Sequence, residues 1–188
     1  FMHIRLLNLK LNYRNHRKIV VIDGKIGYTG GINIRDDHMG KDKKLKPWRD
    51  THIKIEGSGV YALQNIFLDD WRYCKNDNTP PQLYLTNGYF PSPELKGNAT
   101  MQIMTSGPDS QVQRIKETFV HMIINAKERI FIQTPYFVPD DVFISAIRIA
   151  VKSGIDVSIM VPTKPDKKTV YLVTLSFLRE VAELGVKI

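Results

Sequence analysis

The 188-residue sequence has little cysteine and no long apolar run. Its one cysteine, Cys74, cannot form a disulfide within the chain, and no metal-ligand pattern surrounds it. No stretch approaches the roughly 20 apolar residues that a membrane-spanning helix needs. The pattern of a secretory signal peptide is also missing from the first residues. These absences argue against a disulfide-stapled domain and a spanning helix, whereas an apolar content of 43% allows a globular core.

Acidic residues are scarce in the first third of the chain. Residues 1–60 carry 13 Lys/Arg against 6 Asp/Glu, whereas residues 61–188 carry 14 against 13, and the net charge is +8. Four lysines gather in one segment, Lys41, Lys43, Lys44 and Lys46. Such a basic region predicts an anionic partner, namely a phosphate ester, a nucleic acid or an acidic membrane surface. A solvated basic face would have the same composition.

The first part of the chain reads as strands followed by one helix. We expect strands over residues 3–13, 17–22 and 51–56, and an apolar spacing typical of a helix runs over 58–71. Asp23 and Gly24 mark a tight turn that pairs residues 17–22 with 26–29 as a hairpin. The sequence thus predicts a compact first unit over residues 1–75.

A segment rich in proline, glycine and asparagine, residues 76–98, reads as a linker or long surface loop. A second unit over residues 99–188 follows, in which strands and helices alternate. We expect strands over 101–104, 129–134 and 155–161, and helices from a cap at Asp109 or Ser110 to 127, over 139–151 and over 168–184. This alternation predicts an α/β fold with a largely parallel sheet.

The segment with the clearest chemistry begins at His16. On an extended strand His16 and Lys18 project to the same face. An imidazole beside an ammonium suits attack on a phosphoester, because the ring nitrogen reaches phosphorus while the cation holds the phosphate oxygens. The pair Gly30-Gly31 then brings Asn33, whose amide can donate to the same oxygens. An isolated His-x-Lys would more often be an exposed strand pair, but Asp23 and the Gly-Gly-x-Asn sequence favour the functional interpretation.

These residues resemble the phospholipase D superfamily. His16, Lys18 and Asp23 match its His-x-Lys-x4-Asp motif, and Gly30, Gly31 and Asn33 match the downstream extension of that motif. Residues 48–52 (Trp-Arg-Asp-Thr-His) and 133–140 (Gln-Thr-Pro-Tyr-Phe-Val-Pro-Asp) are similar to bacterial cardiolipin synthases in particular. Three such segments in the right order make the resemblance specific over nearly the whole chain.

The resemblance implies a mixed β-sheet flanked by helices, in two pseudo-symmetric halves that share one active site. It also implies phosphatidyl transfer between two phosphatidylglycerol molecules through a phosphohistidine, without a metal or other cofactor. A carboxylate at the place of Asp50 would hold the catalytic imidazole, and Asp23 would support the motif geometry. His52 and Tyr136 are candidates for the pocket wall, and a structural role is open for both.

The sequence departs from the family in having only one His-x-Lys-x4-Asp motif. His3, His38 and His121 lack the lysine and aspartate at the required spacing, so we expect them to be structural or solvated. We therefore expect a piece of a longer protein, in which both halves are truncated and the second motif is missing. Such a fragment would be inactive alone, because its partner histidine is absent.

Two other interpretations stay open. A phospholipase D-like nuclease or other phosphodiesterase would use the same residues, although the segment Lys41–Lys46 has no interleaved aromatics to stack on bases. A non-catalytic fragment that binds a membrane surface or a protein is the third. On the lipid interpretation, the parent protein would lie at the bacterial cell membrane, its partners would be anionic phospholipid and the missing second half, and these residues by themselves would be soluble.

Overall fold

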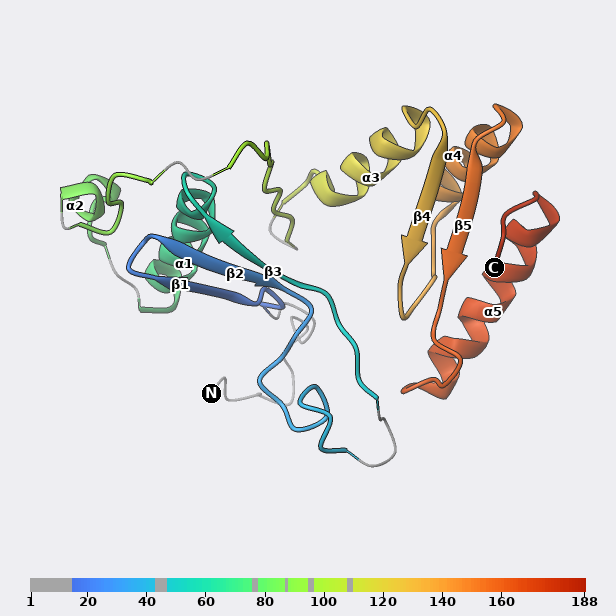
Figure 1. The fold of residues 1–188 in the computed structure, drawn as a ribbon, viewed down its shortest axis with the longest axis horizontal. Coiled ribbons are helices and arrows are strands. Elements are labelled where there is room, and N and C mark those ends of the chain that lie inside the picture. Colours follow the sequence, from blue (N-terminus) through green and yellow to red (C-terminus); the bar gives the residue numbers. More distant parts are fainter. Residues whose placement is uncertain (1–14, 43–46, 76–77, 87, 95–96, 108–109) are drawn as a thin grey trace. The chain divides into compact units, whose positions relative to one another are not determined.

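The computed structural model describes residues 15–42, 47–75, 78–86, 88–94, 97–107 and 110–188. It divides the chain into two compact units, Phe1–Ile103 and Met104–Ile188 (Figure 1). The division falls somewhat later than residue 99, where the sequence predicts the second unit to begin. The predicted strand over 3–13, the lysines at 43, 44 and 46, and the candidate cap Asp109 lie outside the described residues.

The first unit contains an antiparallel sheet in the order β1-β2-β3. Its strands are β1 (Ile19–Ile22), β2 (Ile26–Gly30) and β3 (His52–Glu56). The predicted hairpin is confirmed: Asp23 and Gly24 both have positive φ, at 53° and 64°, as a tight hairpin turn requires. The N–H of Lys25 closes this turn by donating to the carbonyl of Ile22 at 3.0 Å.

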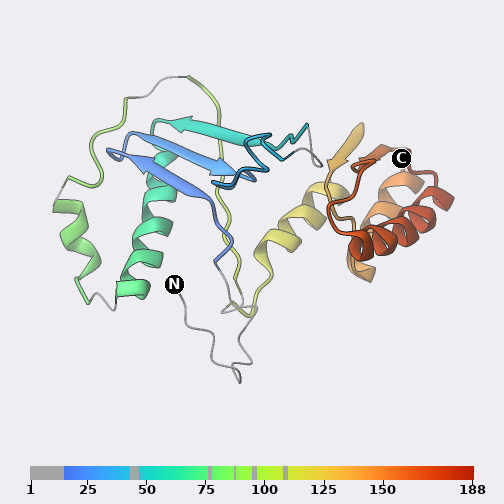
Figure 2. The ribbon, with the colours of Figure 1, turned by 90° about the horizontal axis from the view of Figure 1, so that it is seen from below.

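Helix α1 (Val60–Lys75) packs against one face of this sheet (Figure 2). Ile55, Val60 and Leu63 are buried there, with Ile19 and Val21 of β1 packed against them. Because side chains alternate along a strand, the next residues face away from α1, and Val20 is 50% exposed. One face of the sheet is therefore covered by α1. The described residues leave the opposite face more exposed, and we call it the open face.

Two predictions for the following segment differ from the structure. The predicted loop over 76–98 contains the short helix α2 (Pro81–Thr86), with Pro81 at the first helical position, where its missing N–H costs no hydrogen bond. Tyr84 on this helix is buried and lies edge-on to Tyr89. Residues 101–104 form no strand, because Ile103 packs against the core of the first unit without pairing to the sheet.

The second unit is built on two parallel strands, β4 (Arg129–Gln133) and β5 (Asp156–Met160). Helices α3 (Arg114–Ile124), α4 (Asp141–Lys152) and α5 (Lys168–Glu183) contribute to one core with the inward side chains of these strands. The predicted parallel arrangement is confirmed, and Lys187 begins a further parallel bridge to Ser158. Phe131 and Met160, on the other face of the strands, are 72% and 62% exposed.

The starts of two helices differ from prediction by a few residues. Ser110 does not cap α3 but forms a local turn with Val112, so the helix starts at Arg114. Pro139 precedes α4, and Asp140 is its cap, accepting the N–H of Phe143 at 3.0 Å. Among the described helices, none is long and apolar enough to cross a membrane.

Candidate active site

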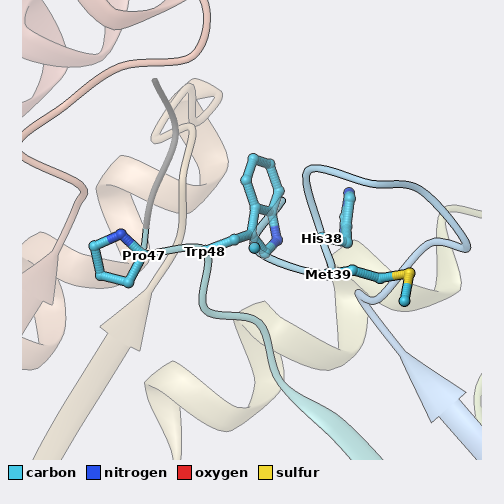
Figure 3. A pocket seen from close by; sticks show the side chains of 5 residues that line it. His38, Met39, Pro47 and Trp48 are labelled. Atoms are coloured by element: carbon cyan, nitrogen blue, oxygen red, sulfur yellow. The ribbon is translucent and has the colours of Figure 1, made fainter. Parts of the chain in front are cut away.

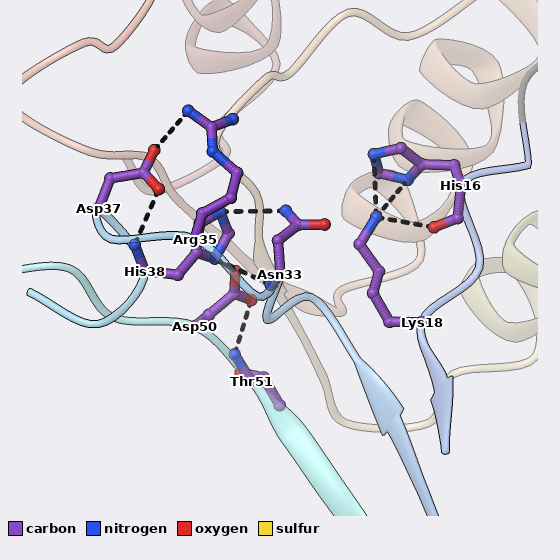
Figure 4. Close-up of polar contacts among 8 residues, drawn as sticks. All are labelled: His16, Lys18, Asn33, Arg35, Asp37, His38, Asp50 and Thr51. Atoms are coloured by element: carbon purple, nitrogen blue, oxygen red, sulfur yellow. Dashed lines mark hydrogen bonds and ion pairs between the residues drawn. The ribbon is translucent and has the colours of Figure 1, made fainter. Parts of the chain in front are cut away.

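His16 and Lys18 lie together at the start of β1 (Figure 4). Lys18 Nζ is 3.1 Å from both ring nitrogens of His16 and donates to the carbonyl oxygen of His16 at 2.7 Å. Neither residue faces α1: Lys18 is half-buried and His16 is exposed. The alternation of the strand thus presents an imidazole and an ammonium side by side on the open face of the sheet.

Asn33 belongs to a separate polar cluster centred on His38 (Figure 4). The backbone N–H of Asn33 donates to His38 Nδ1 at 3.2 Å, and the Asn33 amide nitrogen is 3.0 Å from His38 Nε2. The N–H of His38 donates to Asp37 Oδ1 at 3.0 Å. The side chain of His38 is only 5% exposed, and its two contacts with Asn33 hold Asn33 in place.

Asp50 contacts His38 rather than His16. Its Oδ2 is 3.8 Å from His38 Nδ1, and its Oδ1 accepts the N–H of Thr51 at 2.8 Å. Among the described residues, no polar contact joins Asp50 to His16, so the role expected from the resemblance stays a prediction. The carboxylate thus lies beside the His38–Asn33 pair.

The glycine pair allows two close approaches. A Cβ on Gly31 would lie 2.0 Å from Asp50 Oδ1, and a Cβ on Gly30 would lie 2.4 Å from the carbonyl oxygen of Thr51. Gly30 also has a φ of 151°, which other residues rarely adopt. Both positions therefore need glycine for the polar cluster to pack against the end of β2.

His52 lies in the same cross-strand row as Lys18. Gly30 of β2 pairs with His52 of β3. On its other side, β2 pairs with β1 through Thr29 and Ile19, and continuing this register by one residue sets Lys18 opposite Gly30. The Nδ1 atom of His52 is buried and has no hydrogen-bond partner in the described part of the chain. The register thus puts His52 on the same face of the sheet as Lys18, with Gly30 between them.

Asp23 and Tyr136 lie elsewhere. Asp23 is exposed in the turn after β1, whereas His16 precedes this strand, so the structure does not bring them together. Tyr136 belongs to the second unit, where its hydroxyl donates to Asp166 Oδ2 and Lys167 Nζ is 5.6 Å from its ring centroid. Partial burial, together with the Asp166 carboxylate, raises the pKa of Tyr136 to about 12.

A pocket of about 500 Å³ adjoins the polar cluster, lined by His38, Met39, Gly40, Pro47 and Trp48 (Figure 3). The rings of His38 and Trp48 lie 4.3 Å apart. The buried Trp48 Nε1 has no hydrogen-bond partner among the described residues. Over the same residues, no group of three or more His, Cys, Asp or Glu side chains is placed to hold a metal ion.

Sequence reasoning missed two residues of this region. His38 was expected to be structural or solvated, and it is a buried side chain that binds Asn33, a link to a site residue that the sequence did not predict. Asp70 on α1 binds the segment around His16. The sequence contains a pattern that could have indicated Asp70. This residue lies seven positions after the buried Leu63, on the core-facing side of α1, where an acidic residue is unusual.

The chain is similar to known cardiolipin synthases. Residues 119–188 match the family model described as cardiolipin synthase, PLD-like domain. The chain is 50% identical to the major cardiolipin synthase of Bacillus subtilis over 182 residues, 46% identical to the cardiolipin synthase of Listeria innocua over 183, and 48% identical to cardiolipin synthase 2 of Staphylococcus epidermidis over 183. Each alignment covers 97% of this chain but 37% of the relative.

These comparisons confirm the resemblance to the phospholipase D superfamily and, within it, to bacterial cardiolipin synthases. The helices and strands of the structure confirm the predicted α/β class, and residues 119–188 match the PLD-like domain model. The matched segment of the family model lies in the second unit, whereas the His16–Lys18 pair lies in the first.

Proposed function

We propose that this chain contributes one half of the active site of a phosphatidyltransferase of the cardiolipin synthase type. The observation that carries the proposal is the pairing of His16 with Lys18, 3.1 Å apart on the open face of a sheet, in a chain 46–50% identical to cardiolipin synthases. The proposed substrate is phosphatidylglycerol, presented at a bacterial membrane surface. The basic character of residues 1–60 supports an anionic surface of this kind.

In the proposed reaction, a histidine nitrogen attacks the phosphorus of one phosphatidylglycerol. An N–P bond forms, the P–O bond to the terminal glycerol breaks, and the glycerol takes a proton from a second histidine. A hydroxyl of another phosphatidylglycerol then attacks the phosphohistidine, giving its proton to that second histidine as the N–P bond breaks. The products are cardiolipin and glycerol, and no step requires a metal.

The described residues divide this work among them. Lys18 holds the phosphate oxygens while charge develops there, which is the transition-state interaction expected of a fixed ammonium. Asn33 donates to the same oxygens. If Nδ1 of a neutral His38 accepts the Asn33 N–H, its Nε2 carries the proton and pairs with the Asn33 amide oxygen once the amide is turned over. The amide NH₂ is then free for the substrate.

We further propose that the second histidine comes from a residue outside this sequence. The sequence contains one His-x-Lys-x4-Asp motif, and the chain spans about 37% of the length of the curated relatives that it matches. On this proposal, Asp23 supports the motif from the turn after β1, and His52 lines the phosphate site beside Lys18. The 188 residues alone would not complete the catalytic cycle.

A phospholipase D-like nuclease is the second candidate, because the same pair can attack any phosphodiester. The test is a substrate comparison with a longer protein that carries this chain: phosphatidylglycerol vesicles against a nucleotide diester. We expect glycerol release and cardiolipin formation only from the vesicles. Turnover of the nucleotide diester alone would replace the lipid assignment, and turnover of neither would favour a non-catalytic binding fragment.

A further inference from the structure

The side chains of the residues on both sides of His16 bind one carboxylate of helix α1. Asp70 Oδ2 accepts a hydrogen bond from the Asn15 side-chain amide at 2.7 Å, and Asp70 Oδ1 accepts from Arg17 Nη1, also at 2.7 Å. Asn15 Oδ1 in turn accepts the N–H of Arg17 at 2.9 Å. Asn15, Arg17 and Asp70 therefore form a closed network around the residue that carries the imidazole, which we call the Asp70 clamp.

The clamp acts on the face of the strand opposite to His16. Arg17 points toward α1, as do Ile19 and Val21 farther along, and so His16 and Lys18 are directed to the open face. His16 itself precedes the first residue of β1, and within the described part of the chain no strand pairing fixes its backbone. Asp70 thus supplies the restraint that the sheet does not supply at this position.

We propose that Asp70 is a positioning residue for the His16–Lys18 pair. It engages both neighbours of His16 and leaves the imidazole to Lys18, whose contacts are the ones the chemistry needs. The side chains of Arg17 and Asp70 are 34% and 30% exposed, so the charge pair alone is a weak source of stability. The two carboxylate oxygens of Asp70 bind the residues before and after His16, and this arrangement orders the segment Asn15–Arg17.

The first test reads the position of His16 without using activity, although the importance of that position rests on the proposed function. Histidine imidazole resonances are recorded by NMR for the chain and for Lys18→Gln, each with and without Asp70→Ala. In the parent, Lys18→Gln shifts the His16 resonances because the ammonium touches the ring. In Asp70→Ala, the same change has little effect, because the pair has separated.

Asp69→Ala is the matched control. Asp69 is the neighbouring acidic residue on the same helix, exposed and without a polar partner among the described residues. This variant keeps the parent's response to Lys18→Gln. An Asp70→Ala chain that responds to Lys18→Gln as the parent does would overturn the proposal. If Asp70→Ala does not fold, Asn15→Ala removes two hydrogen bonds of the clamp and leaves the Arg17–Asp70 ion pair, and the same comparison decides.

The second test uses kinetics in the longer active protein. Asp70→Ala lowers kcat by up to about 100-fold, the size expected when a catalytic group is displaced by about 1 Å, while KM stays within about threefold. Asp69→Ala leaves both constants unchanged. If Asp70→Ala is fully active while His16→Ala is inactive, the positioning role of Asp70 is rejected and the proposed function stands. If His16→Ala is fully active, the proposed function is rejected, and the NMR comparison alone decides whether Asp70 positions His16.

Discussion

At Gly31, a hydrogen in place of a methyl group lets the Asp50 carboxylate lie directly against the backbone. The Cβ of an alanine there would be 2.0 Å from Asp50 Oδ1 and 2.6 Å from its Cγ. The carboxylate cannot stay in place, so its position beside His38, the partner of Asn33, changes as well. Gly31 therefore contributes to the site by leaving room for the Asp50 carboxylate.

We expect Gly31→Ala to lower the free energy of unfolding by about 1–3 kcal/mol, as overpacking commonly does. Chemical denaturation of the 188-residue chain measures the loss. Adding Asp50→Ala to the same chain removes the obstructing carboxylate, so the second substitution costs less in the Gly31→Ala background than in the parent. Equal costs in the two backgrounds would show that Gly31 and Asp50 do not collide.

At the scale of single residues, the sequence predicted which side chains of one strand lie together. It did not predict the neighbours of Asp50, which follows the segment after Gly40. The alternation of β-strand side chains is enough to place His16 beside Lys18. The partner of Asp50 depends on where the chain returns after Gly40, and no periodicity encodes that path. For this reason the neighbour of Asp50 was not predicted, and the contact to His16 that the resemblance implies stays a prediction.

Among the elements, α3 and α4 are joined by a contact at the start of α4. Lys116 Nζ donates to Asp140 Oδ2 at 2.7 Å, and Asp140 Oδ1 accepts the N–H of Phe143. The Lys116 ammonium, followed by the Phe143 N–H, holds the pKa of Asp140 below its usual range. A carboxyl group with a lowered folded pKa stabilises the protein above its ordinary pKa of about 3.9 and loses this effect as the pH falls through the folded value.

We therefore expect Asp140→Asn to lower the melting temperature at pH 7 and to lower it progressively less below about pH 4. Asparagine can still cap the helix, so the difference isolates the charge. Asp141→Asn, the adjacent acidic residue without a polar partner among the described residues, should give a smaller change at pH 7. Thermal unfolding at several pH values measures both. A difference for Asp140→Asn that does not vary with pH would contradict the ion-pair account.

The existence of the longer elements was predictable, and their ends were less so. The helices predicted over 139–151 and 168–184 correspond to α4 and α5. Apolar spacing predicted α1, because this helix buries one stripe of side chains. It could not predict α2, whose six residues are too short to show a period, nor that residues 101–104 would pack without pairing. Local turns such as that of Ser110 also moved the start of a helix in a way that spacing does not reveal.

For the whole molecule, the central claim is that His16 acts on phosphorus in a site that this chain completes only in part. The sequence carries one motif, and the chain spans about 37% of its curated relatives. The charge distribution fits the same claim, because the excess of basic residues lies in the unit that contains His16. On the proposed reaction, the second histidine lies outside these 188 residues.

The most direct measurement is a rapid-quench experiment on a longer protein that carries this chain, using phosphatidylglycerol labelled at phosphorus. The account predicts a covalent protein label that is stable to alkali and labile to acid, as expected of a histidine–phosphorus bond. In His16→Ala we expect the formation or the turnover of this label to fall by at least about 10²- to 10⁴-fold, the usual effect of losing a positioned general acid or base. A His16→Ala protein that forms cardiolipin at the parent's rate would contradict the account.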